Sequence, residues 1–118
     1  MRRIGIIGAM EEEVAALKEK MEIKRVLKKA SMEFCEGTLQ GKPVVVVRSG
    51  IGKVNAGLCT QILADVFEVK KVINTGIAGS LDARIDIGDI VISTEALQHD
   101  MDATQFGYPL GQIPSMGM

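Results

Sequence analysis

Short apolar runs alternate along the chain with segments in which apolar residues recur every three to four positions. Residues 2–8 form an isoleucine-rich run without alternation, which is typical of a strand buried on both faces. Residues 11–21 show helical spacing instead. Two further runs over 31–39 and 44–48, separated by the turn residues of 40–43, predict a hairpin.

The alternation continues with a predicted helix over 54–67, a buried strand over 70–74 and another strand over 90–93. This order predicts an α/β protein, a three-layer α/β/α sandwich with a mixed, largely parallel central sheet. Residues 96–118 show no period, and a long aperiodic segment is unusual in a compact domain. We therefore expect residues 1–118 to be the truncated N-terminal portion of a single larger domain.

Composition excludes several classes of function. The net charge of −1 gives no electrostatic case for nucleic acid or an acidic membrane, and 3% aromatic residues are too few for base-stacking platforms. No apolar stretch approaches the ~20 residues that span a bilayer. The apolar run over 4–10 is short and followed by acids, which is unlike a signal peptide, so we expect a cytoplasmic chain with Cys35 and Cys59 reduced.

Three adjacent glutamates follow the first predicted strand. On a helical wheel Glu12 lies about 170° from the apolar stripe, Glu11 about 90° and Glu13 about 70°. Acids in a first helical turn are stabilised by the helix dipole, which accounts for all three. The alternative is that Glu13 points into a cleft at the carboxyl end of the strand, where open α/β sheets bind ligands.

Glycine-containing loops also follow the predicted strands. The sequences at 49–53 (SGIGK) and 75–80 (TGIAGS) match neither the phosphate-binding loop nor the dinucleotide-binding pattern, and each is compatible with a plain turn. Together with the loop at Gly8, they end three strands. If these strands are parallel neighbours, the three loops meet at one edge of the sheet, where backbone N–H groups can receive a ligand.

Five motifs occur in one order along the chain: IGIIGAMEEEV, SGIGKVNAG, INTGIAGS, IGDIVIS and HDMDATQFGYPLGQIP. From residue 1 to about residue 114 they closely resemble the amino-terminal half of bacterial 5′-methylthioadenosine/S-adenosylhomocysteine nucleosidases, in the purine nucleoside phosphorylase-like superfamily. The resemblance implies a homodimeric N-glycosidase that hydrolyses these adenine nucleosides to adenine and a thioribose, in methionine salvage. It implies no cofactor and no metal, and His99, Asp100 and Asp102 are a weak ligand set.

The resemblance also assigns roles to individual residues. Glu13 matches the family's water-activating glutamate. Residues that line the substrate pocket are matched by Met10, Ile51, Ile77, Ala78 and Gly79. Residues that close the alkylthio pocket of the partner subunit are matched by Ala103, Phe106 and Pro114. Many relatives have a serine that helps to hold the water where this chain has Ile77, whose side chain cannot do so.

The other half of the family's site, including the aspartate that acts through the leaving adenine, is expected beyond residue 118, so the chain alone is expected to be inactive. Two alternatives remain. A purine nucleoside phosphorylase needs cationic phosphate ligands, and Arg48 is the only candidate near the glycine loops. A non-catalytic nucleoside-binding or interaction module needs no complete site.

Overall fold

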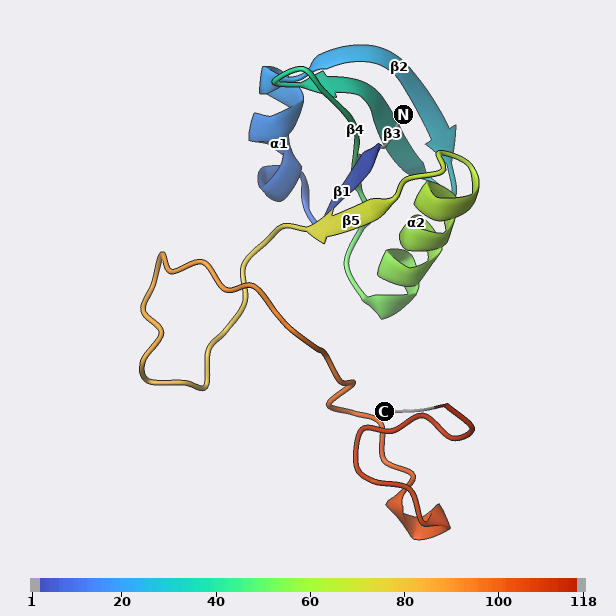
Figure 1. Ribbon diagram of the computed structural model, residues 1–118, viewed down its shortest axis with the longest axis vertical. Helices are drawn as coiled ribbons and strands as arrows, with labels where there is room; N and C mark the ends of the chain where they lie inside the picture. The colour runs from blue at the N-terminus through green and yellow to red at the C-terminus, as the bar shows by residue number, and fades with distance from the viewer. Residues whose placement is uncertain (1–2, 117–118) are drawn as a thin grey trace. The chain divides into compact units, whose positions relative to one another are not determined.

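The computed structural model describes residues 3–116 and divides into two compact units, Met1–Gly79 and Ser80–Met118. The first unit contains the sheet and two α-helices (Figure 1). Its elements are β1 (Ile4–Gly8), α1 (Glu11–Lys20), β2 (Glu22–Lys29), β3 (Met32–Leu39), β4 (Lys42–Arg48), α2 (Lys53–Asp65) and β5 (Lys71–Asn74). The second unit contains one short 3-10 helix, η1 (Thr104–Phe106).

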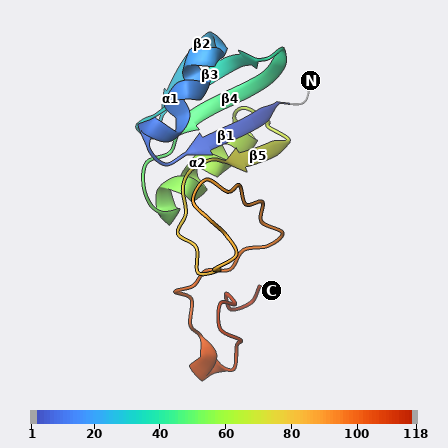
Figure 2. The ribbon, with the colours of Figure 1, turned by 90° about the vertical axis from the view of Figure 1, so that its left-hand side faces the viewer.

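The five strands form one mixed sheet in the order β2-β3-β4-β1-β5, which can be followed in Figure 2. β1 pairs in parallel with β4 on one side and with β5 on the other. The pairs β2–β3 and β3–β4 are antiparallel, so the predicted hairpin is confirmed. Because β4, β1 and β5 run the same way, their carboxyl ends lie at one edge.

Successive residues along a strand point to opposite faces of the sheet, so both faces carry apolar side chains. One α-helix covers each face. The cluster packed against α2 consists of Ile7, Met32, Phe34, Val45, Val47, Cys59, Leu63 and Phe67. The cluster packed against α1 consists of Ile6, Val14, Met21, Cys35, Val44 and Val46. The two helices thus complete the predicted α/β/α layering, with α1 and α2 on opposite sides in Figure 1.

The predicted elements of the first unit are confirmed to within two residues at their ends. The first strand begins at Ile4, and Arg2 lies outside the described residues. The strand predicted over 44–48 is β4, and it begins earlier, at Lys42. The turn before it needs only Gln40 and Gly41, both with positive φ. A two-residue turn with positive φ at both positions matches the twist of a hairpin.

One strand was not predicted. β2 has a charged, mostly exposed sequence with no alternation, and it lies at the sheet edge next to β3. Charged residues on an edge strand discourage pairing with other chains, and they also hide the strand from pattern analysis. The connection to β3 is a tight turn at Ala30 and Ser31, with φ of 51° and 62°.

The predicted strand over 90–93 is wrong. These residues take no regular structure, and Ile90 and Ile92 are exposed by 89% and 87%. A strand is stabilised by hydrogen bonds to a neighbouring strand, and the apolar run has none within the described residues.

Across residues 3–116, no helix has the length and apolar character needed to cross a membrane.

Candidate active site

Three loops meet at the carboxyl edge of the parallel strands, as the sequence predicted. The N–H of Ser49 donates to the carbonyl of Gly8 at 2.9 Å, which ties the loop after β4 to the loop after β1. The N–H of Thr75 donates to the carbonyl of Ile7 at 2.8 Å, which ties the loop after β5 to β1. The ladder hydrogen bonds thus continue one step beyond the strands and fix the starts of the loops.

Glu13 lies in the first turn of α1, half-buried at this edge. Its Oε2 accepts a 2.7 Å hydrogen bond from the N–H of Ala9 and a longer one, 3.3 Å, from the N–H of Met10. The carboxylate also lies against the backbone of Gly76, since a Cβ placed there would be 3.0 Å from Cδ, Oε1 and Oε2. A side chain from α1 therefore contacts the loops after both β1 and β5.

The three glutamates differ in their surroundings, as the helical wheel indicated. Glu12 is exposed. Glu11 is also exposed and pairs with Lys18 at 3.3 Å and with Arg48 at 3.9 Å. Only Glu13 has its carboxylate bonded to the loop backbone. The sequence contained a signal for this bond, because a glutamate at the third helical position characteristically reaches back to the helix N-cap, here Met10.

A cavity of about 400 Å³ opens between the loops after β1 and β4; Glu11 and Glu12 line it, and Glu13 does not. Met10 and Ile51, both predicted to line the substrate pocket, contribute to its wall together with Ser49 and Gly50. The side-chain amide of Asn55, from the first turn of α2, donates to the carbonyl of Ile51 at 2.8 Å. Pattern analysis did not find this residue, whose contact steadies the loop after β4.

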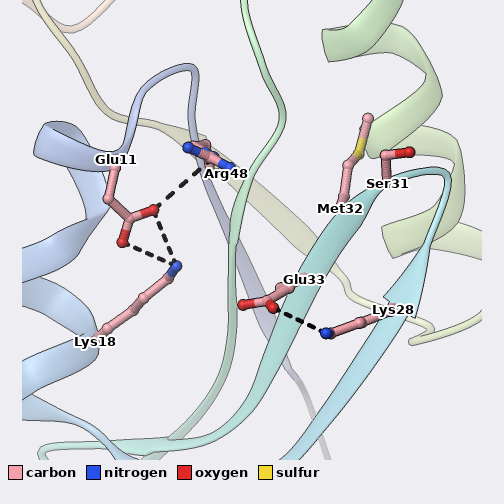
Figure 3. Close-up of a pocket in the computed structure, with 7 residues that line it drawn as sticks. All are labelled: Glu11, Lys18, Lys28, Ser31, Met32, Glu33 and Arg48. Atoms are coloured by element: carbon pink, nitrogen blue, oxygen red, sulfur yellow. Dashed lines mark hydrogen bonds and ion pairs between the residues drawn. The ribbon is translucent and has the colours of Figure 1, made fainter.

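A second cavity, of about 250 Å³, lies between α1 and the ends of β2, β3 and β4 (Figure 3). It is lined by charged groups that pair with one another: Glu11 with Lys18 and Arg48, and Glu33 with Lys28 at 3.5 Å. Glu13 does not line this cavity. Exposed ion pairs of this kind contribute little free energy, and we attach no chemistry to them.

The remaining predicted site residues fall in two places. Ile77, Ala78 and Gly79 directly follow the Glu13 contact at Gly76 and are exposed, Ile77 by 89%. Ala103, Phe106 and Pro114 belong to the second unit, where Ala103 is buried at the start of η1 and Phe106 is 73% exposed.

No group of His, Cys, Asp or Glu within residues 3–116 is arranged to hold a metal ion. The two cysteines are free and buried, on opposite faces of the sheet. Burial raises the pKa of the Cys59 thiol to about 11, and burial also raises the pKa of the Cys35 thiol. Both groups therefore hold their protons at neutral pH and act as small apolar side chains.

The sequence profile of the phosphorylase superfamily matches residues 3–116, which is nearly the whole chain. The chain belongs to the phosphorylase superfamily. Within it, the chain is 52% identical over 113 residues to the 5′-methylthioadenosine/S-adenosylhomocysteine nucleosidase of Staphylococcus haemolyticus, covering 96% of this chain and 50% of that protein.

Solved structures of superfamily nucleosidases have the same fold. The enzyme of Colwellia psychrerythraea, in complex with adenine, has a TM-score of 0.92 at 53% identity, covering 96% of this chain and 47% of that one. The enzyme of Neisseria meningitidis, in complex with methylthio-immucillin-A, has a TM-score of 0.93 at 43% identity. This match covers 99% of this chain and 51% of that one. The resemblance found in the motifs is confirmed, and the chain spans about half the length of the curated relatives it matches.

Proposed function

We propose that this chain supplies the water-activating side of a nucleosidase that hydrolyses the N-glycosidic bond of 5′-methylthioadenosine and S-adenosylhomocysteine. The observation that carries the proposal is the Glu13 carboxylate, which is fixed by the N–H of Ala9 at the carboxyl edge of three parallel strands. In open α/β sheets this edge is where ligands bind. The similarity to nucleosidases that bind adenine and a nucleoside analogue supports the substrate class.

In the proposed reaction, Glu13 accepts a proton from water as the water oxygen bonds to the anomeric carbon of the sugar. The bond from that carbon to the adenine nitrogen breaks, and its electron pair leaves with adenine, which takes up a proton. The products are adenine and the thioribose. A general base positioned in this way typically contributes about 10²–10⁴-fold to the rate.

The other predicted residues take binding roles in this proposal. Met10 and Ile51 contact the sugar and the alkylthio group, and the exposed backbone of 77–79 approaches the nucleoside. The enzyme acts in the cytoplasm as a homodimer, without a cofactor, and the partner-facing wall is formed by Ala103, Phe106 and Pro114. Residues 1–118 are then a portion of one nucleosidase domain.

The alternative reaction uses phosphate in place of water, as in a purine nucleoside phosphorylase. Its candidate ligand, Arg48, lines the cavity that Met10 and Ile51 also line. However, the Arg48 guanidinium lies 3.9 Å from the Glu11 carboxylate, and an anion there meets that negative charge. This pair is exposed and contributes little free energy, so the similarity to nucleosidases, and not this pair, favours water over phosphate as the nucleophile.

Product analysis tests the proposal. The chain is joined to the part of the Colwellia psychrerythraea nucleosidase that it does not match, to give what we call the completed enzyme. This enzyme is incubated with 5′-methylthioadenosine in phosphate buffer. We expect adenine and free methylthioribose, whereas a sugar 1-phosphate would identify a phosphorylase.

The non-catalytic alternative is tested separately, by calorimetric titration of the 118-residue chain with adenosine analogues. Binding by the chain without turnover by the completed enzyme would identify a binding module. Turnover only by the completed enzyme supports the proposed nucleosidase.

A further inference from the structure

We propose that Gly76 is a positioning residue: the absence of a side chain at this position makes the space in which the Glu13 carboxylate is held, with Oε1 left to accept the proton from water. The catalytic consequence rests on the proposed function. The geometric part, that the two residues compete for one space, does not.

The first argument is the space itself. A Cβ on Gly76 would lie 3.0 Å from three atoms of the Glu13 carboxylate group, which is tighter than ordinary van der Waals contact. Gly76 does not have a positive φ, so its backbone conformation is open to other residues. The contact with Glu13, rather than the turn, is therefore the reason that this position needs a glycine.

The second argument is that neither partner can easily move away. On the Gly76 side, the preceding N–H, that of Thr75, is bonded to the carbonyl of Ile7 at 2.8 Å. On the other side, Oε2 of Glu13 is held at 2.7 Å by the N–H of Ala9. The carboxylate thus lies between two loop backbones that are both anchored to β1.

The third argument concerns the two oxygens. Both backbone donors, from Ala9 and Met10, reach Oε2, and neither reaches Oε1. An oxygen that already accepts two hydrogen bonds holds its negative charge more firmly and is a poorer proton acceptor. Oε1 is accordingly the basic oxygen, and a shift of the carboxylate changes where Oε1 lies.

An added methyl group at Gly76 must displace the end of a flexible side chain by a few tenths of an ångström. The fold can tolerate such a shift, but proton transfer is sensitive to it, because a general base acts only within hydrogen-bond reach. Gly8 differs, because a Cβ there would lie 2.7 Å from Cγ1 of the fully buried Val14. Substitution of Gly8 therefore disturbs the core as well as Glu13, whose Cβ would be 3.0 Å away, whereas the three nearest atoms at Gly76 all belong to Glu13.

The geometric claim is tested by NMR on the ¹⁵N-labelled chain, by comparing the Ala9 and Met10 amide proton shifts among variants at one pH. A hydrogen bond to Oε2 moves each amide signal downfield, and we expect Glu13→Ala to remove this displacement. We expect Gly76→Ala to reduce the displacement by roughly half, because hydrogen bonds weaken steeply with distance and angle. Gly57→Ala is the matched control, since a Cβ on Gly57 meets nothing within 4 Å. An unchanged displacement in Gly76→Ala overturns the proposal.

A second variant tests the proposal if Gly76→Ala does not fold. The same substitution is then combined with Glu13→Asp, whose side chain is one methylene shorter. Recovery of the fold supports a clash with the carboxylate, and no recovery overturns the proposal because Gly76 is then simply structural.

The catalytic consequence is measured on the completed enzyme with a double-mutant cycle. We expect Gly76→Ala to lower kcat roughly tenfold with little change in KM, and to add almost nothing in a Glu13→Gln background. Additive losses overturn the claim that Gly76 acts through Glu13. Full activity of Glu13→Gln alone would instead refute the proposed function while the NMR result stands.

Discussion

The backbone N–H of Ala9 donates to Oε2 of Glu13 at 2.7 Å, so a loop residue two positions before the start of α1 holds the third residue of that helix. This contact serves the fold because it satisfies an N–H group near the start of the helix. It also fixes the carboxylate at the edge where the loops after β1, β4 and β5 meet. In the proposed function, one side chain therefore has both a structural and a chemical role.

Replacing Glu13 with Gln separates these roles. The amide oxygen of Gln can still accept from Ala9, so we expect a fold close to that of the wild type. The amide cannot take a proton from water, so kcat of the completed enzyme should fall by about 10²–10⁴-fold. Glu19→Gln, on the exposed far end of α1, is the charge-matched control. Near-normal kcat in Glu13→Gln contradicts its role as the base.

The Glu36 carboxylate on β3 forms ion pairs with two arginines, Arg3 at 2.5 Å and Arg25 on β2 at 2.8 Å. Its side chain is only 18% exposed. We expect Glu36→Gln to lower the free energy of unfolding by about 1–2 kcal/mol, because both charge-assisted contacts are weakened. Glu33→Gln breaks only the exposed pair with Lys28 and should change stability by less than about 0.5 kcal/mol. Equal losses in urea unfolding argue against a special role for Glu36.

Gly37 allows the irregular pairing of β2 with β3. A Cβ on Gly37 would lie closer to the carbonyl oxygen of Glu22 than van der Waals contact allows. The register shift between Ile23 and Arg25 lies next to this point. Since a backbone carbonyl cannot move aside, Gly37→Ala should destabilise the chain by about 2 kcal/mol or more. Gly57→Ala, in the middle of α2, should stabilise it by about 0.5–1 kcal/mol. Thermal unfolding of the two variants checks the opposite signs.

The Cys59 thiol links stability to pH at alkaline values. Burial raises its pKa from 9.0 to about 11, so the folded protein holds the proton more tightly than the unfolded chain does. This contribution is fully present below the unfolded-state pKa and is lost as pH rises from about 9 to about 11, with a slope of at most about 1.4 kcal/mol per pH unit. Urea unfolding at about pH 8 and about pH 10.5 measures the loss. Cys59→Ala should show a smaller loss, and an equal loss contradicts the assignment.

The edge strand β5 presents Val72 and Ile73 to solvent, 41% and 50% exposed. β5 has one charged residue, Lys71, and its outer edge has no neighbouring strand in the described chain. An exposed apolar edge strand is a template for pairing with another chain, so we expect the 118-residue chain to self-associate. Light scattering should give a mass that rises with concentration, and Ile73→Lys should reduce the rise. A compact monomer at all concentrations contradicts this expectation.

The sequence by itself determined the elements whose pattern is local. The runs of β1 and β4, the stripe of Val14 and Met21 on α1, and the glycine loops all follow from residue spacing, because burial on a given face imposes a period. The same spacing distinguished Glu13 from Glu11 and Glu12, and parallel strands then brought the three loops together.

Only the tertiary structure decided the features that depend on a partner far away in the sequence. β2 is a strand because β3 lies beside it, and residues 90–93 are not a strand because no neighbouring strand pairs with them in the described chain. The contact of Glu13 with Gly76 belongs to the same class. No local pattern records it, since the space that a side chain occupies is set by whichever segment the sheet brings against it.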